Sequence, residues 1–303
     1  MFSMYNRRHF VGLAAGAAAV ALPLKSQAAA GAKPAMQLGL IVSAGSDPEA
    51  AIRKVHDMGF PTCQVGVGSF TPDMAARLRS ALDRYKIEAT SLVAGGPGPE
   101  VYDFYKGPLT IGLVPRAYRD ARIAQIKKTS DFAKQCGVLA VQTHCGFIPE
   151  NPNVPVYKEA VDAIRTVAAY CKQNGQNFRC ETGQETPITL LRAIKDVGLD
   201  NVGVNFDAAN LILYGKANPV DALDVLGPLI QGIHAKDGLY PTNPKELGRE
   251  VPIGQGKVNF PVFIKRLKEI GYRGPLTIER EISGPKQTED VRASKIYLEK
   301  LIG

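Results

Sequence analysis

Residues 178–207 read FRCETGQETPITLLRAIKDVGLDNVGVNFD, and this stretch carries the pattern that indicates the fold. It begins with a short strand-like run that ends at Glu181, and it ends with the apolar run Val202–Asp207. Between them, residues 187–196 place apolar side chains at helical spacing. A strand, a helix and a second strand in this order are typical of a parallel sheet. The stretch therefore predicts one strand–helix–strand unit in which both strands end in a carboxylate.

The same alternation extends over the chain from Met36 to its end. Further strands are predicted at Met36–Ser43, Thr62–Val67, Ile87–Ala94, Val138–His144, Ile230–His234 and Pro275–Glu279. Further helices are predicted from Pro48, behind the cap Asp47, and at 73–85, 119–136, 154–174, 219–227, 260–270 and 287–301. Eight strand–helix units predict an α/β protein with a single (β/α)8 TIM barrel. A doubly wound open sheet is the alternative, disfavoured because no glycine-rich dinucleotide fingerprint follows the first strand.

Four of the predicted strands end in a side chain that can bind a metal ion. These residues are Glu181, Asp207, His234 and Glu279, and successive members are 26, 27 and 45 residues apart. Each spacing leaves room for one helix and its loops. In a TIM barrel the carboxyl ends of the strands carry the chemistry, so we expect the four side chains to meet there. Three carboxylates and one imidazole suit a divalent cation with hard ligands.

Three neighbouring residues extend this candidate site. His144 ends its own predicted strand and is interpreted as a substrate contact, with a plain histidine at the barrel mouth as the alternative. Lys236 has the same strand parity as His234, so it would either polarise a substrate oxygen or form an ion pair beside the metal ligands. Glu281 has the parity of Glu279 and competes with it for the fourth ligand position. The long connection at about 97–118 is either a wall of this site or a surface excursion.

Several motifs resemble the sugar isomerase/epimerase superfamily with a xylose-isomerase-like barrel, over residues 36–302. They are Glu181-Thr-Gly, Asn205-Phe-Asp207, His234-Ala-Lys-Asp237-Gly238, Gly254-Gln-Gly256-Lys-Val-Asn-Phe260, Gly271-Tyr272-Arg-Gly274 and Ile278-Glu279-Arg-Glu281. The resemblance implies that Glu181, Asp207, His234 and Glu279 hold one divalent ion. Mn²⁺ or Mg²⁺ is favoured, and Zn²⁺ or Co²⁺ would also suit the site. Family members often form dimers or tetramers, so a homo-oligomer is an open alternative to a monomer.

The expected reaction is proton abstraction next to a carbonyl, through an enediolate. Glu181 and Glu279 are interpreted as the catalytic acid–base pair because their motifs place them on well-separated strands. If His234 is a ligand it must be neutral, so metal affinity should fall as the pH approaches the ordinary histidine pKa of about 6.5.

Two departures from the resemblance matter. Ketose epimerases of the superfamily commonly have a histidine three residues after the metal-binding aspartate, and here that position is Asn210. Asn210 can hydrogen-bond a substrate hydroxyl but cannot act as an acid or base near neutral pH. DNA-repair endonucleases with this barrel gather zinc ions with many histidines. Beyond residue 30 this chain has only His56, His144 and His234, which disfavours a nuclease.

Three functions follow, in order of preference. The first is a metal-dependent isomerase or epimerase of a sugar or sugar derivative. The second is a lyase or dehydratase acting on a keto-sugar, keto-glycoside or keto-inositol. The third is a non-catalytic periplasmic protein that binds a carbohydrate. No nicotinamide or flavin fingerprint is present in the sequence.

Residues 1–30 resemble a twin-arginine export signal, and residues 31–303 are assigned to the barrel domain. Arg7-Arg8 precede the uncharged run Val11–Leu24, which is followed by small-residue cleavage sites at residues 26–30. Fourteen residues are short for a membrane span, and no cysteine follows for a lipid anchor. We therefore expect a periplasmic or secreted product, recognised by the twin-arginine machinery and without a stable membrane anchor. An ordinary secretory signal is the alternative.

Composition is that of an ordinary globular protein. Removal of Arg7, Arg8 and Lys25 lowers the formal net charge from +8 to +5, and no basic stripe interleaved with aromatic residues predicts a nucleic-acid partner. The five cysteines are odd in number and contain no Cys-x-x-Cys, so we expect small core residues and not a disulfide framework.

Overall fold

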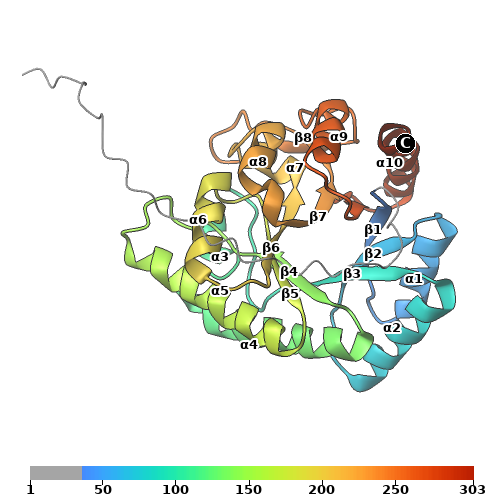
Figure 1. Cartoon of the computed structure of the whole chain (residues 1–303), viewed down its shortest axis with the longest axis horizontal. Coiled ribbons are helices and arrows are strands. Elements are labelled where there is room, and N and C mark those ends of the chain that lie inside the picture. Colours follow the sequence, from blue (N-terminus) through green and yellow to red (C-terminus); the bar gives the residue numbers. More distant parts are fainter. Residues whose placement is uncertain (1–35) are drawn as a thin grey trace, which may run out of the picture. The chain divides into compact units, whose positions relative to one another are not determined.

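The computed structural model describes residues 36–303, so the export signal expected within residues 1–30 lies outside the described part of the chain. Residues 36–303 form a closed barrel of eight strands surrounded by helices (Figure 1). Every strand pair in the barrel is parallel. The barrel strands are β1 Leu38–Ser43, β2 Thr62–Gly66, β3 Glu88–Val93, β4 Ala140–His144, β5 Asn177–Glu181, β6 Val202–Asp207, β7 Ile230–Ala235 and β10 Leu276–Ile278. The predicted (β/α)8 barrel is confirmed, and the open doubly wound sheet is ruled out.

Most outer helices, though not α4, begin where the sequence places a proline in the first turn. Pro48, Pro72, Pro155, Pro187 and Pro219 each lie in a first turn, where the missing N–H breaks no intrahelical bond. The outer helices are α1 Pro48–Asp57, α2 Pro72–Tyr85, α4 Arg116–Cys136, α5 Pro155–Gln173, α6 Pro187–Val197, α8 Pro219–Leu226, α9 Phe260–Glu269 and α10 Pro285–Ile302. Helix α4 starts three residues earlier than predicted, and the other boundaries lie within two residues where both bounds were predicted.

Four short elements were not predicted from the sequence. They are α3 Gly107–Thr110, α7 Ala208–Leu213, and the antiparallel pair β8 Asp237–Leu239 and β9 Arg249–Val251. A 3₁₀ turn also covers Gly227–Leu229. Strands of three residues are too short to show alternation of polar and apolar side chains. Helix α7 follows β6 directly, because the Asp207 side chain accepts a hydrogen bond from the Asn210 N–H at 2.8 Å and caps the helix.

Strand register brings the predicted site residues to one level of the barrel. His144 pairs with Glu181 between β4 and β5, and Asp207 pairs with His234 between β6 and β7. Residue 279 follows the last residue of β10, and its N–H donates to the carbonyl of Ala235 at 3.1 Å. Because all these strands are parallel, the five side chains are delivered to the same end of the barrel.

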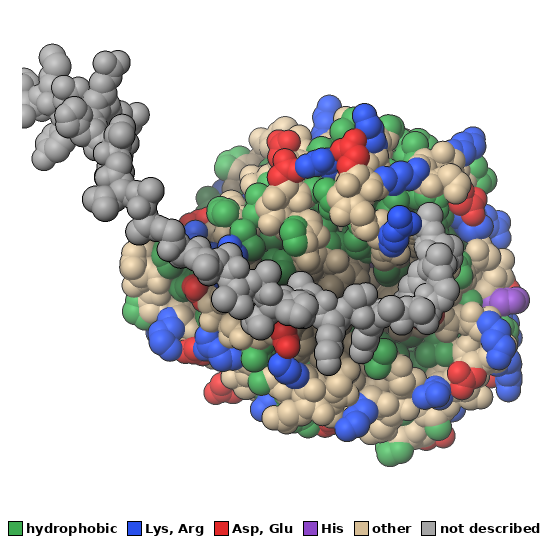
Figure 2. Space-filling model, viewed as in Figure 1, with side chains coloured by type: hydrophobic (Ala, Val, Ile, Leu, Met, Phe, Trp, Pro, Cys, Tyr) green, Lys and Arg blue, Asp and Glu red, His purple; other side chains and the backbone are tan. Residues whose placement is uncertain are grey.

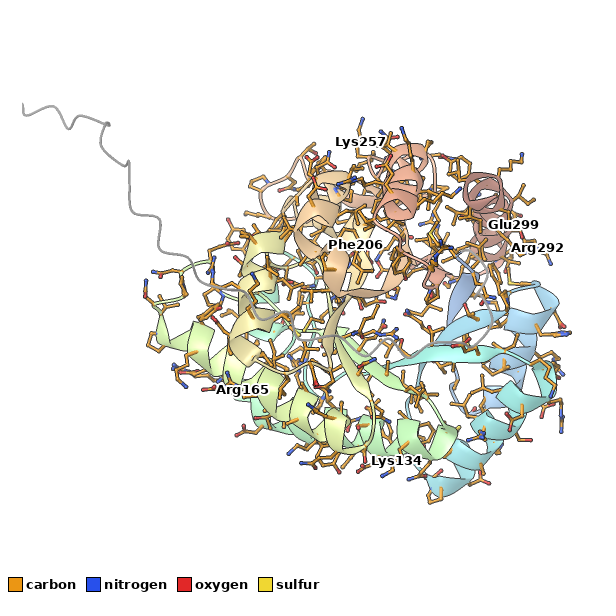
Figure 3. All side chains as sticks on the ribbon, in the orientation of Figure 1. Lys134, Arg165, Phe206, Lys257, Arg292 and Glu299 are labelled. Carbon is orange, nitrogen blue, oxygen red and sulfur yellow. The ribbon has the colours of Figure 1, made fainter. Side chains whose placement is uncertain are left out.

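The apolar core lies between the strands and the helices. Phe206 projects from β6 and its ring stacks on Phe263 of α9 with 5.7 Å between centroids. Figure 3 shows Phe206 inside the ring of helices, whereas Lys134 and Glu299 project from the periphery. The five cysteines are buried and unpaired, as expected from the sequence. Figure 2 shows Lys, Arg, Asp and Glu side chains mixed over the face of the molecule that it presents. Within residues 36–303, no helix combines the length and hydrophobicity needed to cross a bilayer.

Candidate metal centre

Glu181, Asp207, His234 and Glu279 converge at the carboxyl end of the barrel; we call these four residues the ligand cluster. One potential ligand atom from each residue lies within 4.8 Å of the others. His234 Nδ1 lies 3.1 Å from Glu181 Oε1, 3.1 Å from Glu279 Oε2 and 3.6 Å from Asp207 Oδ2. Three of the four residues, Glu181, Asp207 and His234, are buried, and Glu279 is partly buried. The four side chains that end these strands in the sequence therefore meet at one end of the barrel.

The ligand cluster has the chemistry of a cation site. His234 Nδ1, Asp207 Oδ2 and Glu279 Oε2 are buried and form no hydrogen bond in the described residues, and the single Lys236 ammonium, 3.3 Å from Glu279 Oε2 and 3.7 Å from Asp207 Oδ2, is shared between the two carboxylates. Burying unpaired polar and charged atoms is costly unless they bind a cation or hydrogen-bond donors. Three carboxylate residues and one neutral imidazole offer the hard donors that Mg²⁺ and Mn²⁺ prefer. These residues therefore form a site that can hold a divalent metal ion.

Two glutamines fix the orientation of the His234 ring. Gln64 Oε1 lies 2.6 Å from His234 Nε2, and the Gln142 amide nitrogen donates to the same Gln64 oxygen at 2.8 Å. The Gln64 oxygen can only accept, and it lies closer to Nε2 (2.6 Å) than the Gln142 amide nitrogen does (3.2 Å), so the ring proton of neutral His234 is assigned to Nε2. The Nδ1 lone pair is left facing the three carboxylates, where a metal ion would bind. We did not predict the role of these two glutamines, which lie inside β2 and β4.

The negative charge around His234 favours the protonated ring when no metal ion is bound. Burial by itself lowers the pKa of His234, but the nearby carboxylates of Glu181 and Glu279 raise that pKa well above its ordinary value. A proton therefore occupies the imidazole readily when no cation is bound. A metal ion must displace that proton, so binding of the metal releases it.

Lys236 distinguishes Glu279 from Glu281. Its Nζ lies 2.9 Å from Glu281, 3.3 Å from Glu279 and 3.7 Å from Asp207, and its side chain is 1 % exposed. Glu281 lies outside the ligand cluster, and its side chain is 57 % exposed. Burial lowers the pKa of Lys236, yet the three carboxylates raise it well above its ordinary value, so the ammonium stays charged. Asn210 Oδ1 accepts from Lys236 Nζ at 3.3 Å.

His144 lies on the more open side of the ligand cluster. Its Nε2 is 3.6 Å from Glu181 Oε1, and its side chain is 20 % exposed. The ring of Tyr102 packs edge-on against it at 6.2 Å between centroids. His144, Lys236 and Asn210 are thus all beside the ligand cluster, as their interpretation as substrate contacts requires. Asp237 has a different position: its carboxylate accepts from the backbone N–H groups of Gly254, Gly256 and Val258 and anchors that loop.

The connection between β3 and α4 forms a wall of the site. The backbones of Asp103 and Glu246 form an isolated antiparallel β-bridge, and Glu246 belongs to the segment between β8 and β9. Buried Arg122 of α4 fixes this connection through three hydrogen bonds. Its guanidinium donates to the carbonyls of Pro97, Pro99 and Gly112 at 3.3, 3.0 and 2.7 Å. Tyr102 of this connection lies against His144. The structure therefore favours a connection that forms a wall of the site and not one that is only a surface loop.

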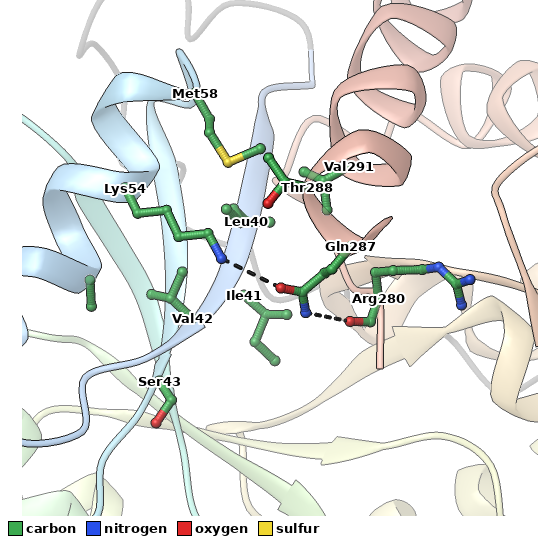
Figure 4. Close-up of a pocket in the computed structure, with 11 residues that line it drawn as sticks. Leu40, Ile41, Val42, Ser43, Lys54, Met58, Arg280, Gln287, Thr288 and Val291 are labelled. Atoms are coloured by element: carbon green, nitrogen blue, oxygen red, sulfur yellow. Dashed lines mark hydrogen bonds between the residues drawn. The ribbon is translucent and has the colours of Figure 1, made fainter. Parts of the chain in front are cut away.

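A separate cavity of about 310 Å³ lies between β1, α1 and α10 (Figure 4). Lys54 Nζ donates to Gln287 Oε1 at 3.5 Å, and Gln287 Nε2 donates to the carbonyl of Arg280 at 2.9 Å. Its lining includes none of the four residues of the ligand cluster. The cavity is therefore distinct from the metal centre, although Arg280 directly follows Glu279.

Comparison with known proteins supports this description. Among solved structures, a xylose isomerase domain protein from Planctomyces limnophilus is 36 % identical, with a TM-score of 0.83, over 88 % of this chain and 98 % of that one. A D-tagatose 3-epimerase-like protein is 21 % identical, with a TM-score of 0.68, over 88 % and 98 % of the two chains. A xylose isomerase-like TIM barrel protein from Mycobacterium smegmatis, solved in complex with magnesium, is 18 % identical, with a TM-score of 0.63, over 85 % and 88 %.

The two more distant structures share the fold, and the first also shares sequence over nearly its whole length. The family described as xylose isomerase-like TIM barrel matches residues 52–301, which include every residue of the ligand cluster. The chain therefore belongs to the xylose isomerase-like TIM barrel family.

Proposed function

We propose that this protein is a divalent-metal-dependent isomerase or epimerase of a sugar or sugar derivative. The observation that carries the proposal is the placement of two carboxylates from different strands beside the same nitrogen of one buried imidazole. Glu181 and Glu279 lie 3.1 Å from the same His234 nitrogen but come from β5 and from the end of β10. Two carboxylates that approach one point from different strands can remove and return a proton at different positions of a bound substrate.

The chain's own residues supply most of the reaction. Glu181 or Glu279 removes the proton next to the substrate carbonyl, and the other returns one to the opposite face or to the neighbouring carbon. A divalent ion, when bound by the ligand cluster, would stabilise the negative charge that develops on the substrate oxygens. The Lys236 ammonium adds positive charge at 3.3 Å from Glu279 and can polarise a substrate oxygen. Mn²⁺ or Mg²⁺ is the preferred ion because most donors are carboxylates.

A lyase or dehydratase is the second candidate, and Asn210 favours it. The Asn210 carbonyl oxygen accepts from Lys236, and an amide does not transfer protons near neutral pH. One carboxylate would then remove a proton while the leaving hydroxyl or alkoxide departs from the neighbouring carbon. This reaction removes one proton from carbon and returns none to it, so it needs only one group that abstracts a proton from carbon. A carbohydrate-binding protein without turnover is the third candidate.

The deciding experiment follows hydrogen exchange in D₂O. The mature protein, loaded with Mn²⁺ or Mg²⁺, is incubated with ketoses and 3-keto-glycosides, and products are analysed by mass spectrometry and chromatography. We expect incorporation of one deuterium with a change of sugar isomer, lost in Glu181→Gln and Glu279→Gln. Glu281→Gln, outside the ligand cluster, should retain exchange.

Loss of water or of an alcohol from the substrate would favour the lyase. Binding of a sugar without exchange, under metal-saturated conditions, would favour the binding protein and contradict the proposed reaction. Protein that binds no divalent ion would contradict all metal-dependent versions.

We also propose export through the twin-arginine pathway to the periplasm or the exterior. The pair Arg7-Arg8 before the uncharged run Val11–Leu24 supports this location. Replacement of both arginines by lysine should leave the precursor inside the cell. Unchanged export of that variant would instead indicate an ordinary secretory signal.

A further inference from the structure

Gln184 lies against the His144 ring on the side away from the ligand cluster. Its amide nitrogen is 3.1 Å from His144 Nδ1, and Gln184 itself is 1 % exposed. The opposite ring nitrogen, Nε2, is 3.6 Å from Glu181 Oε1. His144 is thus held between an amide on one side and a carboxylate on the other.

These two neighbours require the same form of the neutral ring. A carboxylate oxygen only accepts hydrogen bonds, so a proton is favoured on the ring nitrogen that faces Glu181. With the proton on Nε2, Nδ1 carries a lone pair and needs a donor. The Gln184 NH₂ group is placed to donate to it. The Gln184 contact therefore selects the Nε2–H tautomer, and the negative charge of Glu181, 3.6 Å from Nε2, favours the same form without a hydrogen bond.

Close backbone packing fixes the position of Gln184. A Cβ atom on the preceding residue, Gly183, would lie 2.9 Å from Asn210 Cβ and 3.3 Å from the Tyr214 ring. Only glycine allows the segment after β5 to approach α7 this closely. Within residues 36–303, Gln184 Oε1 is buried and has no hydrogen-bond partner.

We propose that Gln184 is a positioning residue that holds His144 in the Nε2–H form, directed at the substrate side of Glu181. The 3.6 Å separation from Glu181 exceeds hydrogen-bond length, so this N–H is free to donate to a substrate oxygen. His144 would then bind a hydroxyl or carbonyl oxygen of the sugar next to the carboxylate that moves the proton. The role assigned to the substrate oxygen depends on the proposed function, whereas the tautomer does not.

Nuclear magnetic resonance of the Mg²⁺-loaded protein tests the tautomer without any substrate. Residues 31–303 contain three histidines, and a His144→Asn variant identifies the His144 signals. Spectra are recorded at increasing pH until the His144 signals no longer shift, which identifies the neutral ring. We expect the ¹⁵N pattern of a ring protonated at Nε2. An Nδ1–H ring would overturn the proposal, because Gln184 would then accept instead of donate.

Gln184→Leu tests whether the glutamine is responsible. We expect His144 to lose its single tautomer, with metal content unchanged and turnover reduced about 10- to 100-fold, the range found when groups that orient site residues are removed. Gln173→Leu, on an exposed part of α5, is the matched control and should change neither. Retention of a pure Nε2–H ring in Gln184→Leu would overturn the positioning role. If no turnover is found in any form, the ring signals still decide the proposal.

Discussion

Lys236 forms its shortest ion pair with Glu281, at 2.9 Å, although it also reaches Glu279 at 3.3 Å. The pair draws Glu281 to the rim of the site and leaves Glu279 Oε2 facing His234 at 3.1 Å. Two glutamates separated by one residue, which share strand parity, thus occupy different environments. The buried one belongs to the ligand cluster, and the exposed one balances the charge of a buried lysine.

This difference predicts that replacement of glutamate by glutamine affects metal binding at position 279 but not at position 281. Glu279→Gln removes a charged oxygen donor and should abolish stoichiometric binding of Mn²⁺ or Mg²⁺. Glu281→Gln should leave about one ion per chain, because its carboxylate does not face the other ligands. Metal content of the dialysed proteins measures both. Equal loss of metal in the two variants would show that Glu281 also binds the ion.

A second prediction concerns Gln64, which holds the proton-bearing nitrogen of His234 at 2.6 Å. Gln64→Leu removes that acceptor and frees the ring to rotate or change tautomer. Metal affinity should fall about 10- to 100-fold, the usual effect of removing a group that orients a ligand. Competition with a fluorescent chelator measures the affinity. Gln173→Leu serves as the control, and an unchanged affinity in Gln64→Leu would mean that the backbone alone positions His234.

The fold was predictable because its signal repeats. Each barrel strand contains buried apolar residues, and proline often marks the first turn of the helix that follows, so errors at single boundaries do not change the topology. The four members of the ligand cluster were also predictable, since parallel strands deliver their end residues to one place. By contrast, Gln64, Gln142 and Gln184 act through contacts across the barrel, with partners far away in the sequence. Nothing local distinguishes them from other polar residues.

The position of the β3–α4 connection was not predictable for the same reason. Its bridge from Asp103 to Glu246 joins segments that follow strands on opposite sides of the barrel. The contacts of Asn210 were not predictable either. Its N–H donates to Asp207 and its side-chain oxygen accepts from Lys236 because it lies in α7, and this helix is too short to recognise from the spacing of apolar residues.

The third prediction concerns the stability contributed by Lys236. Lys236→Met leaves the carboxylates of Asp207 and Glu279 buried without their cation, which should lower the free energy of unfolding of the metal-free protein by about 3–5 kcal/mol. A bound divalent ion replaces the missing charge, so the loss should be smaller with Mg²⁺ than with a chelator. Denaturant unfolding under both conditions measures the difference. Lys257→Met, an exposed lysine at the periphery (Figure 3), is the control and should have little effect. Equal losses with and without metal would contradict the charge argument.

The fourth prediction concerns the wall of the site. Arg122 is 2 % exposed and donates to three carbonyls of the β3–α4 connection. Arg122→Met keeps most of the packing of the side chain but removes these hydrogen bonds, so amide hydrogen exchange in residues 97–112 should become at least several-fold faster. Exchange in the barrel strands should change much less. Arg292→Met, on the exposed face of α10, should leave the connection as it is. Exchange that stays slow in Arg122→Met would show that contacts with the segment around Glu246 are sufficient to hold the connection.

The last prediction uses Glu185, which sequence reasoning overlooked. Its side chain is 2 % exposed and neither carboxylate oxygen has a hydrogen-bond partner in the described residues. Burial raises the pKa of Glu185 from its ordinary value of about 4.5 to about 8. Between these two values the folded protein keeps a proton that the unfolded chain has released. Stability should therefore fall as the pH rises through this window, by about 1.4 kcal/mol per pH unit from this group.

Glu185→Gln removes that titration while keeping the size of the side chain. The variant should resemble the parent protein near pH 4.5 and become progressively more stable than it towards pH 8, by up to roughly 5 kcal/mol. Denaturant unfolding at several pH values, with a chelator present throughout, measures this difference, and titration of the ligand cluster cancels because both proteins share it. Glu246→Gln, at an exposed position, should show no such divergence. Parallel stability curves for Glu185→Gln and the parent would mean that Glu185 is ionised in the folded protein, with water or Lys216 balancing its charge.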